Sequence, residues 1–132
     1  DDMHATLRTH AHEIEKYSMI YHDEAERDAA WRAINAACPG VELTSSLPRN
    51  MEINAPGVTK GSGLLALAAH LGLTRAQTMA VGASGKARAM IEAAGLGVAM
   101  GNATDDIRKV ADVTTDDNNQ DGVAAAIEKY VL

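Results

Sequence analysis

The chain has 132 residues and a formal net charge of −6 without a Lys/Arg cluster, which argues against a surface that binds nucleic acid. Aromatic residues make up 3% of the sequence and Phe is absent, so Ala, Val, Leu, Ile and Met must build the core. The single cysteine excludes an internal disulfide, and no apolar run is long enough to cross a bilayer. We expect a cytoplasmic protein that contacts neither nucleic acid nor membrane.

The first 54 residues predict the order α-β-α-β-β. Asp23 and Glu26 form the spacing of a capping box, which starts the second helix, and Cys38-Pro39-Gly40 ends it. A turn at 47–49 separates two short strand patterns and predicts a hairpin. The expected elements are a helix at 2–12, a strand at 16–21, a helix with an apolar face at Ala30, Trp31, Ile34 and Ala37, and strands at 41–46 and 50–54.

The segment Ala55-Pro56-Gly57 interrupts both periodicities and is the predicted boundary between domains 1–54 and 55–132. Short helices and strands alternate after it, which predicts a parallel sheet flanked by helices, the α/β class. The expected strands are 78–81, 97–100 and 112–115, and the expected helices are 59–70, 86–94, one that starts at Thr104, and 122–130.

The loop Gly82-Ala-Ser-Gly-Lys-Ala87 follows the first strand of this sheet. Loops at the carboxyl ends of parallel strands are where α/β folds hold anionic ligands, yet this loop has no acidic side chain. Gly85-Lys86 is similar to part of a nucleotide-binding P-loop. That motif requires Gly and Ser or Thr where Ala80 and Ala87 stand, so the nucleotide interpretation is weak.

Six short stretches together carry a resemblance that extends from about Glu15 to Leu132. They are Asn50-Met-Glu-Ile-Asn54, Gly57-Val-Thr-Lys-Gly61, Ala80-Val-Gly82, Ala89-Met-Ile-Glu-Ala-Ala-Gly95, Gly97-Val-Ala-Met-Gly-Asn102 and Asp121-Gly-Val-Ala124. In order and spacing these stretches resemble the C-terminal part of a Cof-type phosphatase of the haloacid dehalogenase superfamily. The resemblance implies a Rossmann-like core with an inserted α+β cap, of which residues 1–54 would be the last part. It also implies Mg²⁺-dependent hydrolysis of phosphate monoesters through an aspartyl-phosphate.

By this resemblance, Lys60 matches the lysine that pairs with the transferred phosphoryl group. Ala83, Lys86 and Ala87 stand where the family pattern Gly-Asp-x-x-Asn-Asp holds Mg²⁺, and they offer no oxygen ligand, so we expect no cofactor in this chain. Asn102 matches a position near the phosphate loops, and a role as the N-cap of the next helix is the alternative.

The family nucleophile belongs to an Asp-x-Asp-Gly-Thr motif that ends a strand. Asp2-Met-His-Ala-Thr-Leu7 has a slight likeness to it, but His4 and Ala5 replace the second Asp and the Gly, and no apolar strand precedes. An ordinary helix is the favoured interpretation, so no nucleophile is found. We expect a fragment or an engineered derivative of such a phosphatase.

Other polar or reactive residues favour structural roles. His4, His10 and His12 lack the spacing that chelation on a helix prefers, which indicates a solvated face. Cys38 is expected to be a small buried hydrophobe, and Ser84 has no evident base partner. Asp121 is expected to be the N-cap of the last helix, an alternative to any role in the site.

Two hypotheses of function follow. The first is a derivative of a phosphatase that hydrolyses nothing by itself, because its nucleophile and metal carboxylates are missing. The second is a non-catalytic scaffold that self-associates through an uncovered sheet edge, or binds a complementing N-terminal fragment. Under either hypothesis, Lys60, Lys86 and Asn102 are candidates for binding phosphate or sulfate without a metal. The alternative for Lys86 is a side chain that extends into solvent.

Overall fold

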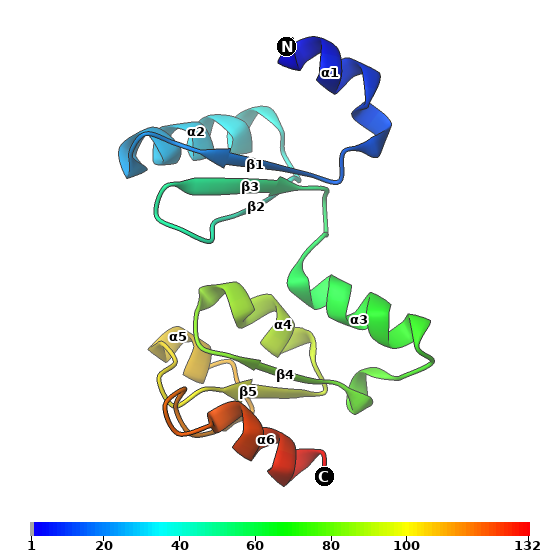
Figure 1. Cartoon of the computed structure of the whole chain (residues 1–132), viewed down its shortest axis with the longest axis vertical. Helices are drawn as coiled ribbons and strands as arrows, with labels where there is room; N and C mark the ends of the chain where they lie inside the picture. The colour runs from blue at the N-terminus through cyan, green and yellow to red at the C-terminus, as the bar shows by residue number, and fades with distance from the viewer. Residues whose placement is uncertain (1) are drawn as a thin grey trace. The chain divides into compact units, whose positions relative to one another are not determined.

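The computed structural model describes residues 2–132, which divide into two compact units (Figure 1). The first unit extends to Val58, and the second runs from Thr59 to Leu132. The functional division of the chain at 54 and 55, with a partial cap on its N-terminal side, stays a prediction. Within residues 2–132, no helix combines the length and the hydropathy needed to span a bilayer.

The first unit is a three-stranded antiparallel sheet with helices. Strands β1 and β2 both pair with the central strand β3, in the order β1-β3-β2, so the predicted hairpin is confirmed. The predicted N-terminal helix is α-helical only in its first part and continues as a 3₁₀ turn. Its elements are α1 (Met3–Thr9), a 3₁₀ turn (Ala11–Glu13), β1 (Lys16–Ile20), α2 (Glu24–Ala37), β2 (Glu42–Thr44) and β3 (Asn50–Asn54).

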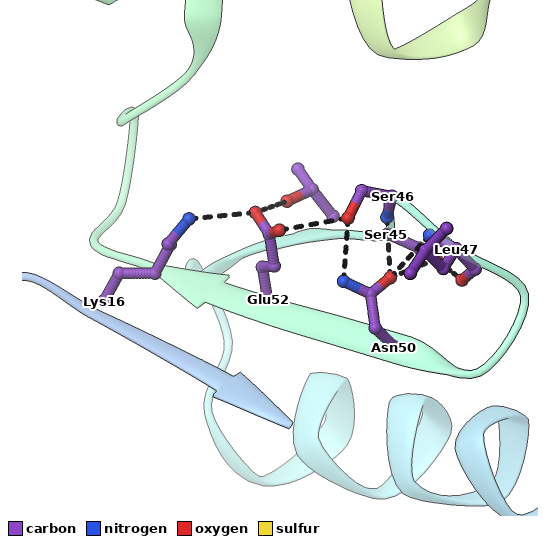
Figure 2. A network of polar contacts seen from close by, with 7 residues as sticks. Lys16, Ser45, Ser46, Leu47, Asn50 and Glu52 are labelled. Carbon is purple, nitrogen blue, oxygen red and sulfur yellow. Dashed lines mark hydrogen bonds and ion pairs between the residues drawn. The ribbon is translucent and has the colours of Figure 1, made fainter. Parts of the chain in front are cut away.

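Side chains alternate across β3, so its two faces differ in chemistry. Met51 is completely buried and belongs to the face that α2 covers. Asn50 and Glu52 belong to the opposite face, where Figure 2 shows them on the side of the sheet away from the helix. Since Met51 is the only apolar side chain of this unit that is buried among the described residues, the unit has a small core.

The opposite face carries a hydrogen-bonded network (Figure 2). The Asn50 side-chain oxygen accepts hydrogen bonds from the backbone N–H groups of Ser46 and Leu47, both at 2.7 Å, and so fixes the turn before β3. Lys16 donates to Glu52 at 3.2 Å, and this contact is the main reason that the pKa of Glu52 lies below its usual value. The network therefore ties together β1, β3 and the turn between β2 and β3.

The N-terminus of α2 differs in detail from the predicted capping box. Asp23 accepts a hydrogen bond from the Glu26 backbone N–H at 2.8 Å, which confirms the N-cap. The Glu26 carboxylate, however, accepts from the backbone N–H of His22, one residue before the cap. At the other end of α2, the expectation of a buried Cys38 is wrong. Cys38 is exposed because it is the C-cap residue, beyond the turns of α2 that pack on the sheet.

The second unit is a parallel sheet flanked by helices, which confirms the predicted fold class. Its three strands have the order β4-β5-β6, and both pairings are parallel. In Figure 1, α4 and α6 lie on opposite faces of this sheet. Its elements are α3 (Lys60–His70), a 3₁₀ turn (Arg75–Gln77), β4 (Met79–Gly82), a 3₁₀ turn (Gly85–Ala87), α4 (Arg88–Ala93), β5 (Leu96–Ala99), α5 (Asp105–Arg108), β6 (Val113–Thr114) and α6 (Gly122–Tyr130).

The core of this unit lies between the sheet and its helices and is built from small and aliphatic side chains, as the composition predicts. Ile91 of α4 and Ile107 of α5 are large members of this core, and both are almost fully buried. Alanine supplies most of the remaining members, and such small side chains allow helices and strands to approach closely. The cluster comprises Ala80, Ile91, Ala94, Ala99, Met100, Ala103 and Ile107.

Candidate functional site

The segments that follow β4, β5 and β6 meet at the carboxyl edge of the sheet. The backbone N–H of Met100, after β5, donates to the carbonyl of Gly82 at the end of β4 at 2.9 Å. The N–H of Gly101 donates to the carbonyl of Asp116, after β6, at 3.0 Å. The sequence predicts a ligand site at this edge of the sheet. We call the segments that follow β4, β5 and β6 the carboxyl-edge loops.

The loop after β4 is a tight turn that folds back on the strand. The Ala87 N–H donates to the Ser84 carbonyl at 2.8 Å, and Gly85–Ala87 form a 3₁₀ turn. A Cβ on Gly82 would lie 2.2 Å from the Cβ of Ala87, so only glycine fits at the end of β4.

This turn does not suit Mg²⁺. It places Ala83, Lys86 and Ala87 where the family resemblance expects metal ligands, but two methyl groups and an ammonium provide no oxygen donor. Among residues 2–132, no group of three or more His, Cys, Asp or Glu side chains is arranged to hold a metal ion. We therefore assign no reaction step to a metal ion at this turn.

Lys60 is the first residue of α3, and the structure brings this helix end against α4. Thr59 and Ser62 form a reciprocal capping box that starts α3. A Cβ on Gly61 would lie only 2.3 Å from the carbonyl oxygen of Ala89, because the two helices approach without an intervening side chain. The segment with Lys60 therefore adjoins the first turn of α4, just beyond the loop that carries Lys86.

The carboxylate of Asp106 places a negative charge beside the loop that follows β4. No sequence pattern assigned Asp106 to the candidate site. It is an exposed residue in the first turn of α5, and its carboxylate lies next to Gly85. A hydrogen bond from Thr104 is the main cause that lowers the pKa of Asp106, and the charge of Arg88 contributes. No local sequence pattern could place Asp106 beside Gly85, because their proximity depends on how α5 packs.

Two residues near the carboxyl edge, Asn102 and Asp121, were considered as helix caps from the sequence. The N-cap of α5 is Thr104, so the alternative that Asn102 caps this helix is wrong. Asn102 is exposed between β5 and α5, and its role toward phosphate stays a prediction. Asp121 occupies the N-cap position of α6, but its side chain makes no capping hydrogen bond and its backbone is left-handed, with φ 54°. The predicted position of this cap is confirmed, while its hydrogen bond is not formed.

The N-terminal segment forms a helix, which confirms the interpretation that the sequence favoured over a nucleophile motif. Asp2 is the N-cap of α1, where its carboxylate accepts hydrogen bonds from the N–H groups of His4 at 3.0 Å and Ala5 at 3.3 Å. This arrangement differs from the strand end on which the nucleophile motif depends. His10 and His12 are exposed, and each contacts Glu13. These histidines belong to a solvated face, in agreement with their spacing.

The chain belongs to the family of haloacid dehalogenase-like hydrolases, because the sequence model of that family matches residues 2–127. Over 92 residues, 70% of this chain, it is 49% identical to the 5-amino-6-(5-phospho-D-ribitylamino)uracil phosphatase YcsE of Bacillus subtilis. The resemblance to Cof-type phosphatases stated from the sequence is thereby confirmed.

Solved structures agree with this assignment. A phosphatase of the superfamily from Bacteroides thetaiotaomicron matches 98% of this chain with a TM-score of 0.77 and 28% identity. A subclass IIB sugar phosphatase of the same superfamily matches 78% of the chain with a TM-score of 0.69 and 28% identity. The chain spans 37% of YcsE, 46% of the first structure and 40% of the second, so it corresponds to less than half of each relative.

Proposed function

We propose that the chain contributes the C-terminal portion of a Cof-type phosphatase, in which Lys60 binds the phosphoryl group of a phosphate monoester. Family membership and the position of Lys60 at the start of α3, beside the carboxyl-edge loops, support this role. Negative charge on the transferred phosphoryl oxygens must be stabilised, and a fixed ammonium group does so. Phosphatases of this superfamily generally use Mg²⁺.

We further propose that these 132 residues hydrolyse no phosphate monoester by themselves. The observation that carries this proposal is the turn Gly82–Ala87, whose side chains offer no carboxylate to a metal. In addition, Asp2 lies at a helix N-cap, where its carboxylate already accepts two backbone hydrogen bonds. The nucleophile and the metal ligands would therefore have to come from other residues.

The test is an assay of the pure chain with p-nitrophenyl phosphate and Mg²⁺, with full-length YcsE as the positive control. We expect YcsE to release nitrophenolate and the 132-residue chain to release none above the buffer rate. Turnover that grows with the concentration of the chain and disappears with EDTA would contradict the proposal.

A second experiment tests the missing ligands without relying on activity. The triple variant Ala83→Asp, Lys86→Asn, Ala87→Asp restores the family pattern at the turn, and Mg²⁺ that binds only the folded state raises its thermal stability. We expect the melting temperature of the variant to increase with MgCl₂ above the effect of NaCl at matched ionic strength. We expect no such increase in the unchanged chain. An equal increase of the melting temperature in both proteins would mean that the side chains of this turn do not determine whether the chain binds Mg²⁺.

A second candidate function is binding of phosphate or sulfate without a metal, at Lys60 and Lys86. It is favoured by the replacement of acidic ligands with a cation and by the close approach of Gly61 to Ala89, which brings the two lysine-bearing segments together. We expect inorganic phosphate to raise the melting temperature beyond the effect of matched ionic strength. Lys60→Ala is expected to abolish this increase, whereas Lys109→Ala, an exposed lysine after α5, should retain it. Equal responses of the two variants would mean a nonspecific ionic effect.

A further inference from the structure

The turn after β4 packs against the first turn of α5 (Figure 1). The backbone N–H of Thr104, the N-cap of α5, donates to the Ala83 carbonyl at 3.0 Å and holds the two segments together. Asp106 belongs to this first turn, and one of its carboxylate oxygens would lie 3.9 Å from a Cβ on Gly85. Because glycine has no side chain, nothing of residue 85 separates this carboxylate from the turn that carries Lys86.

The exposed carboxylate of Asp106 is ionised at neutral pH and can only accept hydrogen bonds. A hydrogen bond from the Thr104 side chain is the largest cause that holds the pKa of Asp106 below its ordinary value. The backbone N–H groups of Asp106 and Ile107 also donate to it, and the charge of Arg88 acts in the same direction. A carboxylate offers about four acceptor positions, so these hydrogen bonds leave about one for a donor from outside the protein.

Basic residues lie in and beside the same turn. Lys86 belongs to it, Arg88 begins α4 directly after it, and Lys60 begins α3, which packs on α4. Arg88 donates to Glu92 at 2.9 Å, so it already has an acidic partner within α4. An anion bound by the lysines at this turn would therefore meet the carboxylate of Asp106 as well as positive charge.

A carboxylate beside an anion site distinguishes oxyanions by whether they carry a proton. Hydrogen phosphate and a singly protonated phosphate monoester have a P–OH group, which donates a short and strong hydrogen bond to a carboxylate. Sulfate is fully deprotonated at neutral pH, so it has no donor and is only repelled by the carboxylate. The same pair of lysines can therefore hold one anion well and the other poorly.

We propose that Asp106 makes the anion site of Lys60 and Lys86 selective for protonated phosphate over sulfate. The P–OH group of the bound anion donates to the Asp106 carboxylate, while its other oxygens accept hydrogen bonds from the lysines. This inference rests on the proposed metal-free binding at the two lysines, and it adds the class of anion that the site accepts.

Asp105 provides a matched control for the charge of Asp106. Both residues are exposed and lie in the first turn of α5, so both complement the helix dipole with the same negative charge. The Asp106 oxygen, however, is the atom that an added Cβ on Gly85 would approach. A role that depends only on charge or on the helix therefore predicts equal effects of Asp105→Asn and Asp106→Asn, whereas selectivity predicts a difference.

Nuclear magnetic resonance titrations of the full 132-residue chain with inorganic phosphate and with sodium sulfate measure the two affinities. The amide signals of Gly85 and Lys86 report binding at the turn, at neutral pH and with the ionic strength held constant by NaCl. We expect phosphate to bind about tenfold or more tightly than sulfate, because only phosphate gains the hydrogen bond to the carboxylate.

The two variants separate selectivity from charge. We expect Asp106→Asn to reduce the preference for phosphate to less than about twofold, mainly through tighter binding of sulfate, because the carboxamide does not repel it. We expect Asp105→Asn to leave the ratio of the two affinities unchanged. Circular dichroism checks that each variant is folded, and if Asp106→Asn is not, the ratio measured on the unchanged chain decides.

Three results would overturn the proposal. They are equal affinities of the unchanged chain for the two anions, equal changes of the ratio in Asp105→Asn and Asp106→Asn, and an Asp106→Asn variant whose affinities for both anions rise by the same factor. In each case, a phosphate response that Lys60→Ala abolishes would leave metal-free anion binding intact. If neither anion shifts an amide signal of the unchanged chain, metal-free binding fails, and the selectivity fails with it.

Discussion

The contact between α3 and α4 at Gly61 offers the sharpest test of how the candidate site is held together. In Gly61→Ala, the new Cβ would lie 2.3 Å from the Ala89 carbonyl oxygen and 3.0 Å from the Cβ of Ala93. Ordinary contact begins at 3.4 Å, so the two helices must move apart by about 1 Å at this point. The neighbour at the shorter distance is backbone, which cannot avoid the methyl group by changing rotamer.

The matched control is Gly63→Ala, two residues along the same helix, where an added Cβ meets no atom within 4 Å. Alanine is favoured over glycine in a helix by about 1 kcal/mol, so Gly63→Ala is expected to stabilise the protein by about 0.5–1 kcal/mol. Because both variants share this gain, the difference between them isolates the cost of overpacking. We expect Gly61→Ala to be less stable than Gly63→Ala by about 1–3 kcal/mol.

Urea unfolding followed by far-ultraviolet circular dichroism measures this difference. Fluorescence of Trp31 is unsuitable, because Trp31 belongs to α2 in the first unit and α3 belongs to the second. A lower midpoint for Gly61→Ala, with an unchanged slope, would support the argument. Equal stabilisation by the two substitutions would refute it, since it would mean that α3 and α4 do not approach closely at Gly61.

Two further predictions concern the network of the first unit in Figure 2. Asn50→Ala should destabilise the protein by about 1–3 kcal/mol in urea unfolding, because the N–H groups of Ser46 and Leu47 lose their acceptor, whereas Asn50→Asp keeps an acceptor and should cost less. Equal losses would show that this oxygen does not fix the turn. The Lys16 contact lowers the pKa of Glu52 in the folded state, so the unfolded chain takes up the proton first as the pH falls. The stability that Glu52 provides is therefore present at neutral pH and decreases below about pH 4.3. Urea midpoints should consequently differ between the unchanged chain and Glu52→Gln at about pH 7, and this difference should decrease as the pH falls below about 4.3. A difference that stays constant as the pH falls would contradict this assignment.

Local sequence signals determined most of the secondary structure. Apolar periodicity, the capping residue Asp23 and glycines at turns located the helices and strands, because these features act over a few residues. The alternation of strands and helices after Gly57 was sufficient to predict a parallel sheet. The absence of metal ligands at Ala83, Lys86 and Ala87 was also evident from the sequence, since it is a matter of residue type alone.

Contacts between distant segments were decided only by the tertiary structure. The approach of Gly61 to Ala89, the position of Asp106 beside Gly85, and the exposure of Cys38 depend on how separate elements pack, and no local pattern encodes that packing. Thus the sequence alone determined the family, the elements and the chemistry of the turn, whereas the fold decided which residues surround that turn.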